Sequence, residues 1–162
     1  MKLKNLYIII ALLILLSVLS FILSQKKILE ANPVKKYSTL CGAYENKPIL
    51  IGDKKIFAYI ADNVCKKTTG LSGSSQLLDD EGMLFIFDRP GNYGFWMKDM
   101  NYSIDIVWIG EDLTILGLEK DLKPGTYPEV FGQKYTSKYV LELPSGISDK
   151  NNIKVGDKII FL

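Results

Sequence analysis

Three ionisable residues lie inside apolar stretches whose alternation is typical of β-strands. Lys98 follows Phe95 and Trp96, Asp105 lies in an Ile-Asp-Ile-Val-Trp run, and Glu142 lies in a Val-Leu-Glu-Leu run. Because side chains alternate between the two faces of a strand, each charge shares a face with large apolar neighbours. A buried charge is costly unless it is paired, and such groups often have shifted pKa values. Lys98, Asp105 and Glu142 are therefore the candidate catalytic residues.

Two carboxyl groups and one lysine could support acid–base hydrolysis. Asp105 and Glu142 would serve as general acid and base, and Lys98 would shift the pKa of one of them. In a second arrangement Lys98 forms a structural ion pair with a carboxylate. In a third, each charge points to solvent from a half-exposed strand. The sequence pattern is compatible with all three arrangements.

Aromatic residues gather in the same region and could stack on a flat ligand such as a sugar. The two tryptophans of the chain, Trp96 and Trp108, are the largest of them. The alternative is that these rings fill the core. The predicted ligand-binding residues are Trp96, Lys98, Asn101, Asp105, Trp108 and Glu142.

Other chemistries find little support in the sequence. The chain has no His, so a Cys–His nucleophile is excluded, and a metal site would depend on carboxylates. No glycine-rich phosphate loop, nucleophile elbow or zinc-protease motif is present. We therefore predict no metal and no cofactor, and we favour a non-enzymatic role over catalysis.

The N-terminal segment predicts a membrane anchor. Eighteen consecutive uncharged residues, Leu6–Leu23, would form a helix about 27 Å long, close to the hydrocarbon thickness of a bilayer. A cleaved signal peptide is the alternative, but no small-x-small cleavage site precedes Lys26 and Lys27. The short N-terminal tail with Lys2 and Lys4 favours a cytoplasmic N-terminus and a C-terminal domain outside the cytoplasm.

The chain divides into three predicted parts: an anchor at residues 1–24, a stalk at residues 25–46 and a β-rich domain at residues 47–162. Removing Lys2 and Lys4 from the 20 basic residues leaves 18, against 18 acidic ones, so the exposed part is neutral. A neutral domain without a basic stripe disfavours nucleic-acid binding, since phosphate contacts dominate that affinity.

Two cysteines, Cys41 and Cys65, lie beyond the predicted anchor. An even number of cysteines in an exported domain predicts one disulfide. Two free thiols or half of a metal site are the alternatives. A disulfide would fasten the end of the stalk to the domain.

Short apolar runs between Gly, Pro and Asp turns predict seven or eight strands. Pro48–Ile51 and Lys54–Ile60 form a hairpin around a Gly-Asp turn. Asp62 is the predicted N-cap of a short helix that Gly70 ends. Further strands are predicted at residues 82–87, 93–98, 103–109, 113–118, 138–143 and 158–161, with a helical turn at residues 144–151. The predicted fold is mainly β, a single sandwich or barrel with one or two short helices.

Several stretches, in order along the chain, resemble the motifs of one family. They are Thr69-Gly70-Leu71, residues 82–87, residues 95–101, Ile104-Asp105-Ile106, residues 139–146 and Lys154-Val155-Gly156-Asp157. Over residues 47–162 the chain is similar to the domain of unknown function 192 family. The resemblance implies one compact β-sandwich or barrel, often exported, from bacteria and archaea. It implies no established activity, substrate or cofactor.

The chain departs from the family pattern after its Gly-Leu step. The family commonly has a longer residue and a nearby basic one there, whereas this chain has the small, polar stretch Ser72–Ser75. Lys98, Asn101, Asp105 and Glu142 match polar positions of the family motifs, which modestly strengthens their selection.

The sequence thus favours a membrane-tethered binding or accessory module of the cell envelope. Its partners would be the membrane and a small molecule, glycan or protein of the envelope. One alternative is an envelope hydrolase that uses Asp105 and Glu142, and another is a structural or assembly partner that presents a sheet edge. A structure separates these functions by whether Trp96, Lys98, Asp105 and Glu142 converge.

Overall fold

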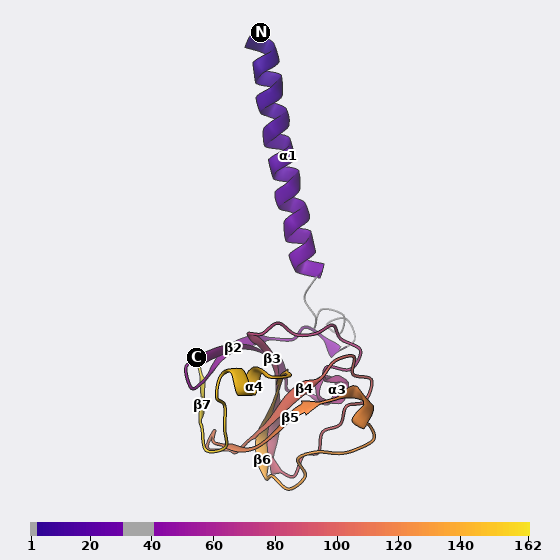
Figure 1. Cartoon of the computed structure of the whole chain (residues 1–162), viewed down its shortest axis with the longest axis vertical. Helices are drawn as coiled ribbons and strands as arrows, with labels where there is room; N and C mark the ends of the chain where they lie inside the picture. Colours follow the sequence, from indigo (N-terminus) through magenta and orange to yellow (C-terminus); the bar gives the residue numbers. More distant parts are fainter. Residues whose placement is uncertain (1–2, 31–40) are drawn as a thin grey trace.

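The computed structural model describes residues 3–30 and 41–162. Helix α1 (Leu3–Glu30), drawn in indigo in Figure 1, contains the long apolar run. Its described side chains, at residues 7, 9, 10 and 12–24, are exposed. Within the described residues, no helix combines the length and the hydropathy of a membrane span. The membrane anchor therefore stays a prediction.

The predicted stalk at residues 25–46 is partly built into other elements. Residues 25–30 continue helix α1, and Asn46 already begins the first strand. Residues 31–40 of the predicted stalk lie outside the described residues.

Cys41 and Cys65 form the predicted disulfide, with their Cα atoms 5.5 Å apart. Cys65 lies in helix α3 (Val64–Thr69), so the bond joins the chain ahead of the first strand to this helix. Asn63, not Asp62, caps the helix: its side-chain oxygen accepts a hydrogen bond of 2.9 Å from the Lys66 amide. Asp62 instead pairs with the Lys66 ammonium at 3.0 Å, because it lies one turn before that lysine.

Seven strands form one curled sheet with the order β5-β4-β6-β3-β2-β1-β7 (Figure 1). They are β1 (Asn46–Ile51), β2 (Lys54–Ala61), β3 (Glu81–Gly91), β4 (Ile104–Ile109), β5 (Ile115–Leu122), β6 (Ser137–Pro144) and β7 (Ile159–Phe161). Among these described strands, only β2 and β3 pair in parallel. A bridge between Thr114 and Lys158 brings the two ends of the sheet together. The mainly β prediction is confirmed, as a curled half-barrel and not a two-sheet sandwich.

The sheet buries an apolar cluster on each face. The first, the seven-strand cluster, draws on every strand, as the inside of a curled sheet does. Its members are Ile49, Ile51, Ile56, Ala58, Ile60, Leu84, Val107, Ile109, Ile115, Leu141, Leu143, Ile147, Ile153 and Ile159. The second, the loop-covered cluster, comprises Tyr59, Ala61, Leu71, Leu77, Met83, Phe85, Met97, Met100, Ile104, Ile106, Trp108, Leu122 and Val140. Loop residues such as Leu71, Leu77 and Met97 cover this second face.

The predicted strand at residues 93–98 does not form. Both edges of β3 are already paired, with β2 and with β6, so the following segment finds no free strand edge. It makes a single bridge between Phe95 and Phe131 and lays its apolar side chains over the sheet. The alternation of apolar residues here reflects packing onto a sheet face and not a ladder of hydrogen bonds.

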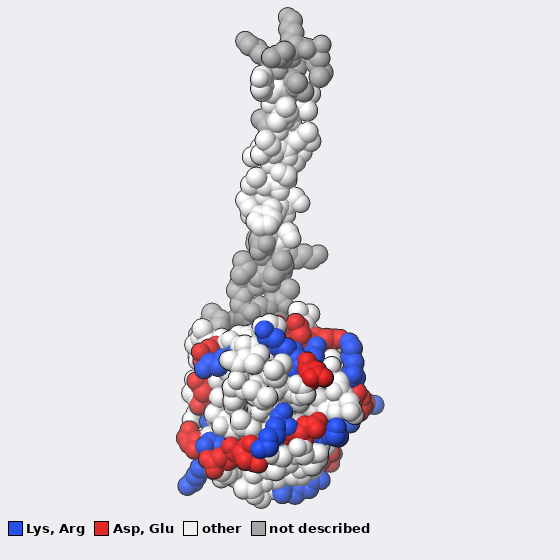
Figure 2. All heavy atoms as spheres, turned by 90° about the vertical axis from the view of Figure 1, so that its left-hand side faces the viewer, with Lys and Arg blue, Asp and Glu red and all other residues white. Residues whose placement is uncertain are grey.

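Two further short helical elements lie in the part of the domain that the structure describes. They are the 3-10 turn η2 (Pro124–Thr126) and helix α4 (Ile147–Lys150), which falls inside the predicted helical turn. On the face of the molecule in Figure 2, acidic and basic side chains are intermixed and form no continuous basic patch.

Candidate ligand pocket around Glu142

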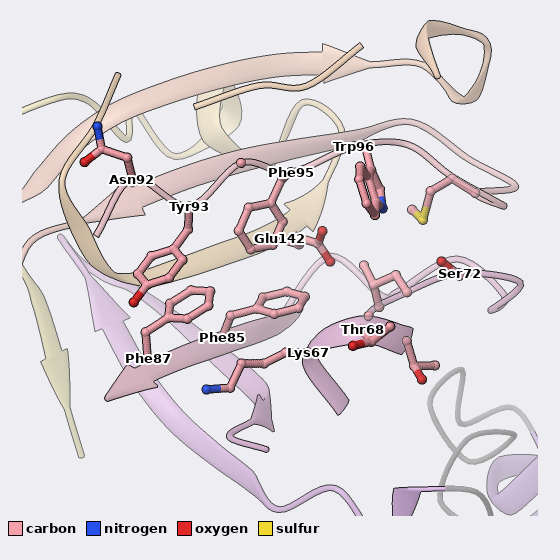
Figure 3. A pocket seen from close by; sticks show the side chains of 15 residues that line it. Lys67, Thr68, Ser72, Phe85, Phe87, Asn92, Tyr93, Phe95, Trp96 and Glu142 are labelled. Atoms are coloured by element: carbon pink, nitrogen blue, oxygen red, sulfur yellow. The ribbon is translucent and has the colours of Figure 1, made fainter. Parts of the chain in front are cut away.

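A pocket of about 420 Å³ opens over the loop-covered face of the sheet. Strands β3 and β6 supply its floor, the end of α3 and the turn at residues 67–72 supply one wall, and residues 92–96 supply another. Figure 3 shows side chains from all of these segments pointing into one space. Segments far apart in the sequence therefore meet at one site.

Aromatic rings make up much of the lining. Phe85 and Phe95 meet edge to face with centroids 4.8 Å apart, and Phe87 stacks on Tyr93 at 3.5 Å. Trp96 is 54% exposed at the rim. Its ring and that of Tyr127, 6.5 Å apart, extend the aromatic surface beyond the pocket. Such surfaces bind flat or apolar groups through stacking and dispersion.

Gly70 allows the turn after α3 to pass closely over this aromatic floor. Its φ of +51° lies in the region that residues with a side chain rarely adopt, and a Cβ there would lie 3.4 Å from the Phe85 ring. This geometry accounts for the Gly at the Thr-Gly-Leu step, which brings Thr68, Thr69 and Ser72 to the wall of the pocket.

Glu142 is the buried polar group of the pocket. It pairs in register with Met83 on β3 and Ile106 on β4, so its side chain shares a face with these apolar residues. The residue is 5% exposed, and its Oε2 atom has no hydrogen-bond partner among the described residues. This desolvation raises the pKa of Glu142 to about 8. At neutral pH the group is therefore mainly a neutral carboxylic acid.

Asp105 lies on the other face of the sheet. The register pairs Asp105 with Leu143 and the adjacent Ile106 with Glu142, so the two carboxyl groups point to opposite sides. Asp105 is fully buried, and its two oxygens accept hydrogen bonds of 3.0 Å from the backbone amides of Asp121 and Ser148. The predicted carboxylate pair does not form, because neighbouring positions of paired strands alternate between faces.

The remaining predicted site residues lie outside the lining of this pocket. Lys98 is exposed, and none of the described ion pairs contains it. Trp108 is buried in the core and donates from Nε1 to the Tyr93 carbonyl at 3.1 Å. Asn101 donates to the Ser74 carbonyl at 3.1 Å. Of the predicted set, only Trp96 and Glu142 line the pocket.

Comparison with known proteins assigns this chain to a family. A family model described as "Uncharacterized ACR", DUF192, matches residues 48–161, which is most of the chain. The chain belongs to the DUF192 family. None of the curated proteins matches it.

Solved structures share the DUF192 fold. A Sinorhizobium meliloti 1021 protein, proposed to be a transcription regulator, superposes with a TM-score of 0.69 at 22% identity, covering 74% of this chain and 95% of its own. A protein of unknown function from Novosphingobium aromaticivorans DSM 12444 gives a TM-score of 0.69 at 23% identity, covering 75% and 89%. At these identities the likeness shows the fold alone.

Sequence reasoning missed several lining residues of the DUF192 pocket. No strand pattern in the sequence indicates Lys67 as a lining residue. In the structure its ammonium lies 4.9 Å from the centre of the Phe87 ring. Phe85 and Phe87 belong to the aromatic region that the sequence indicated for stacking, and their spacing of two places both on one face of β3. Within the described residues, no three potential metal-ligating side chains lie together.

Proposed function

We propose that this DUF192 protein is a binding module, tethered to the membrane of the cell envelope by α1, that holds a small ligand in the pocket at Glu142. One observation carries the binding part: a pocket of about 420 Å³ combines aromatic walls with a buried carboxyl group that has no partner at Oε2. Ligand sites typically have this composition, an apolar lining with a few polar groups that fix orientation.

The same pocket gives little support to catalysis. Asp105 and Glu142 lie on opposite faces, so a mechanism with two carboxylates has no second group. Among the described contacts, no hydroxyl of the lining residues is hydrogen-bonded to Glu142, so no activated nucleophile is formed. A ligand that is bound and not transformed fits these contacts better.

The tether rests on helix α1 and on the cysteines. The helix runs for 28 residues, about 42 Å, and carries eighteen consecutive uncharged residues. Its described apolar side chains, such as Leu13 and Leu15, are exposed and so are free to face lipid. The Cys41–Cys65 disulfide supports the proposal of an oxidising compartment for the β domain, outside the cytoplasm.

Filling the pocket is expected to weaken small-molecule binding. Thr68 lines the pocket near the end of α3, and Thr68→Trp would place a large ring in its space. We expect soluble aromatic fragments to give ligand-observed saturation-transfer NMR signals with the full chain in detergent micelles. The Thr68→Trp variant should lower their affinity by roughly tenfold or more, since the fragment and the new ring compete for one volume.

Val64→Trp is the matched control, because Val64 lies on the same helix, is highly exposed and does not line the pocket. Its fragment binding should equal that of the unsubstituted chain. If no fragment signal depends on position 68, the binding-module proposal is wrong.

Charges in the centre of α1 are expected to prevent membrane insertion. Each Arg near the middle of a membrane helix costs roughly 2.5–3.5 kcal/mol on insertion scales, so Ile14→Arg with Leu16→Arg should move the protein out of the carbonate-resistant membrane fraction. The matched control is Ile14→Ala with Leu16→Ala, which keeps the segment uncharged.

A phosphatase fused after Leu162, active only outside the cytoplasm, reports the location of the domain. We expect it to be active with the natural sequence and with the alanine control. Carbonate-resistant membrane association of the arginine variant, or an inactive phosphatase on the natural chain, would count against the tether.

A further inference from the structure

We infer that the ligand of this pocket is a primary ammonium compound with an apolar, ring-bearing body, and that its ammonium group pairs with the Glu142 carboxylate. The inference rests on the proposed binding function and names the ligand class of that same pocket. It is drawn from the surroundings of Glu142, the aromatic lining and the balance of charges in the pocket.

The first support is the buried, unpartnered carboxyl group. Glu142 is more than nine-tenths buried, lines the pocket and leaves Oε2 without a hydrogen bond. In Figure 3 its carboxyl group lies between Phe95 and Trp96. A buried acceptor of this kind calls for a donor, and an ammonium group has three donors and needs no acceptor in return.

The second support is the aromatic lining around that carboxyl group. The faces of aromatic rings attract cations, more strongly where water is excluded. The pocket already contains one example, since the Lys67 ammonium lies 4.9 Å from the centroid of Phe87. Carboxylate and rings together match an ammonium on an apolar body, while Trp96 at the rim can stack on a ring of the ligand.

The charge balance of the pocket separates ligand classes. Apart from Glu142, the titratable lining residues are Lys67 from α3 and Tyr93 from the segment after β3. Directly opposite Glu142, β3 and β4 present Met83 and Ile106. Glu81 lies on the same face of β3 two positions before Met83, outside the pocket lining, and accepts a hydrogen bond of 2.8 Å from the Tyr59 hydroxyl. An anionic ligand would meet the carboxyl group and the negative ring faces. A cation meets one like charge, Lys67, whose nitrogen lies at the Phe87 end of the pocket in Figure 3.

Binding of an ammonium would release a proton. Burial raises the pKa of Glu142 to about 8, so the free pocket at neutral pH holds mainly the protonated acid. An ammonium replaces that proton as the counter-charge, and the proton passes to the solvent buffer. The affinity should therefore rise by roughly tenfold per pH unit below about pH 8 and level off above it.

The test compares 2-phenylethylamine with 2-phenylethanol and 3-phenylpropionate, which have similar bodies but are neutral and anionic. The full chain is labelled with ¹⁵N in its two tryptophans and kept in detergent micelles. Each compound is titrated into it at pH values from about 6 to 9. The indole signal of Trp96 reports the pocket and is assigned by its loss in Trp96→Phe. We expect the amine to bind most tightly from about pH 8 upward and its affinity to fall at lower pH.

Glu142→Gln keeps the size of the side chain but cannot become an anion. It should weaken amine binding by roughly tenfold or more at about pH 8 and remove the pH dependence. Glu129→Gln, at an exposed position outside the pocket, should leave binding unchanged.

Tighter binding of the alcohol or the acid than of the amine at about pH 8 would overturn the ammonium inference and leave the binding module standing. Equal amine affinity in Glu142→Gln would also overturn it. If none of the three compounds changes the Trp96 indole signal, the inference is overturned as well. The fragment experiment with Thr68→Trp independently tests the binding function.

Discussion

Replacing Glu142 with glutamine is expected to remove a loss of stability that the protein suffers between about pH 5 and pH 8. The pKa of Glu142 is about 8 in the folded protein, against an ordinary value of 4.5. In this interval the folded state binds the proton that the unfolded state has lost, so the free energy of unfolding falls as pH rises. Above about pH 8 both states are ionised and the loss is complete, on the order of 4–5 kcal/mol.

The stability curves of the glutamine variant and the natural protein should therefore cross as the pH rises. A buried amide with an unpartnered group costs roughly 1–3 kcal/mol at every pH, so the variant should be equal or weaker at about pH 5. At about pH 8.5 it should be the more stable protein, because it avoids a buried anion.

Urea unfolding of the full chain across this range measures both curves. The chain contains no His, so no other side chain has an ordinary pKa between about 5.5 and 7.5. Glu129→Gln serves as the exposed control and should keep the slope of the natural protein. A natural protein whose unfolding free energy is flat from pH 5 to pH 8 would contradict the buried state of Glu142.

Replacing Asp105 with asparagine is expected to destabilise the domain by roughly 3–5 kcal/mol without changing the ligand pocket. Its two oxygens accept amide hydrogens from Asp121, at the end of β5, and Ser148, in α4. Asparagine keeps one acceptor and turns an NH₂ group toward the other amide, so one buried donor loses its partner. The Asp105 side chain therefore holds the end of β5 and helix α4 against the same face of the sheet.

Chemical denaturation and the phenylethylamine titration check the two halves of this prediction. Asp149→Asn is the matched control, because Asp149 lies beside Ser148 in α4 but is exposed, with a surface ion pair to Lys120. It should cost less than about 1 kcal/mol. A small effect of Asp105→Asn on unfolding, or a loss of ligand affinity in the folded variant, would show that Asp105 has a role other than the structural one.

Local patterns in the sequence predicted much of the domain. The hairpin of β1 and β2 follows from apolar runs on either side of a Gly-Asp turn, and β4 and β6 follow from their β-branched and aromatic residues. The disulfide follows from an even number of cysteines in a domain predicted to be exported. These features depend on residues close in sequence or on the composition of the whole chain.

The candidate site was less predictable, because it depends on how the strands meet. Alternation places Glu142 among apolar residues of its own strand, but it does not say which residues of β4 share that face. A one-residue change of register would bring Asp105 and Glu142 to the same side. The observed pairing of Ile106 with Glu142 separates them.

The sequence by itself determined that this protein has a β domain, a disulfide and an acidic residue in an apolar strand at position 142. It also determined an uncharged run of eighteen residues near the N-terminus, which lies within helix α1. Only the tertiary structure decided that α3, Gly70 and the segment after β3 close an aromatic pocket over Glu142. The physical reason is that hydrophobic burial on a sheet face is non-directional, so strand alternation cannot specify which distant loop covers which side chain.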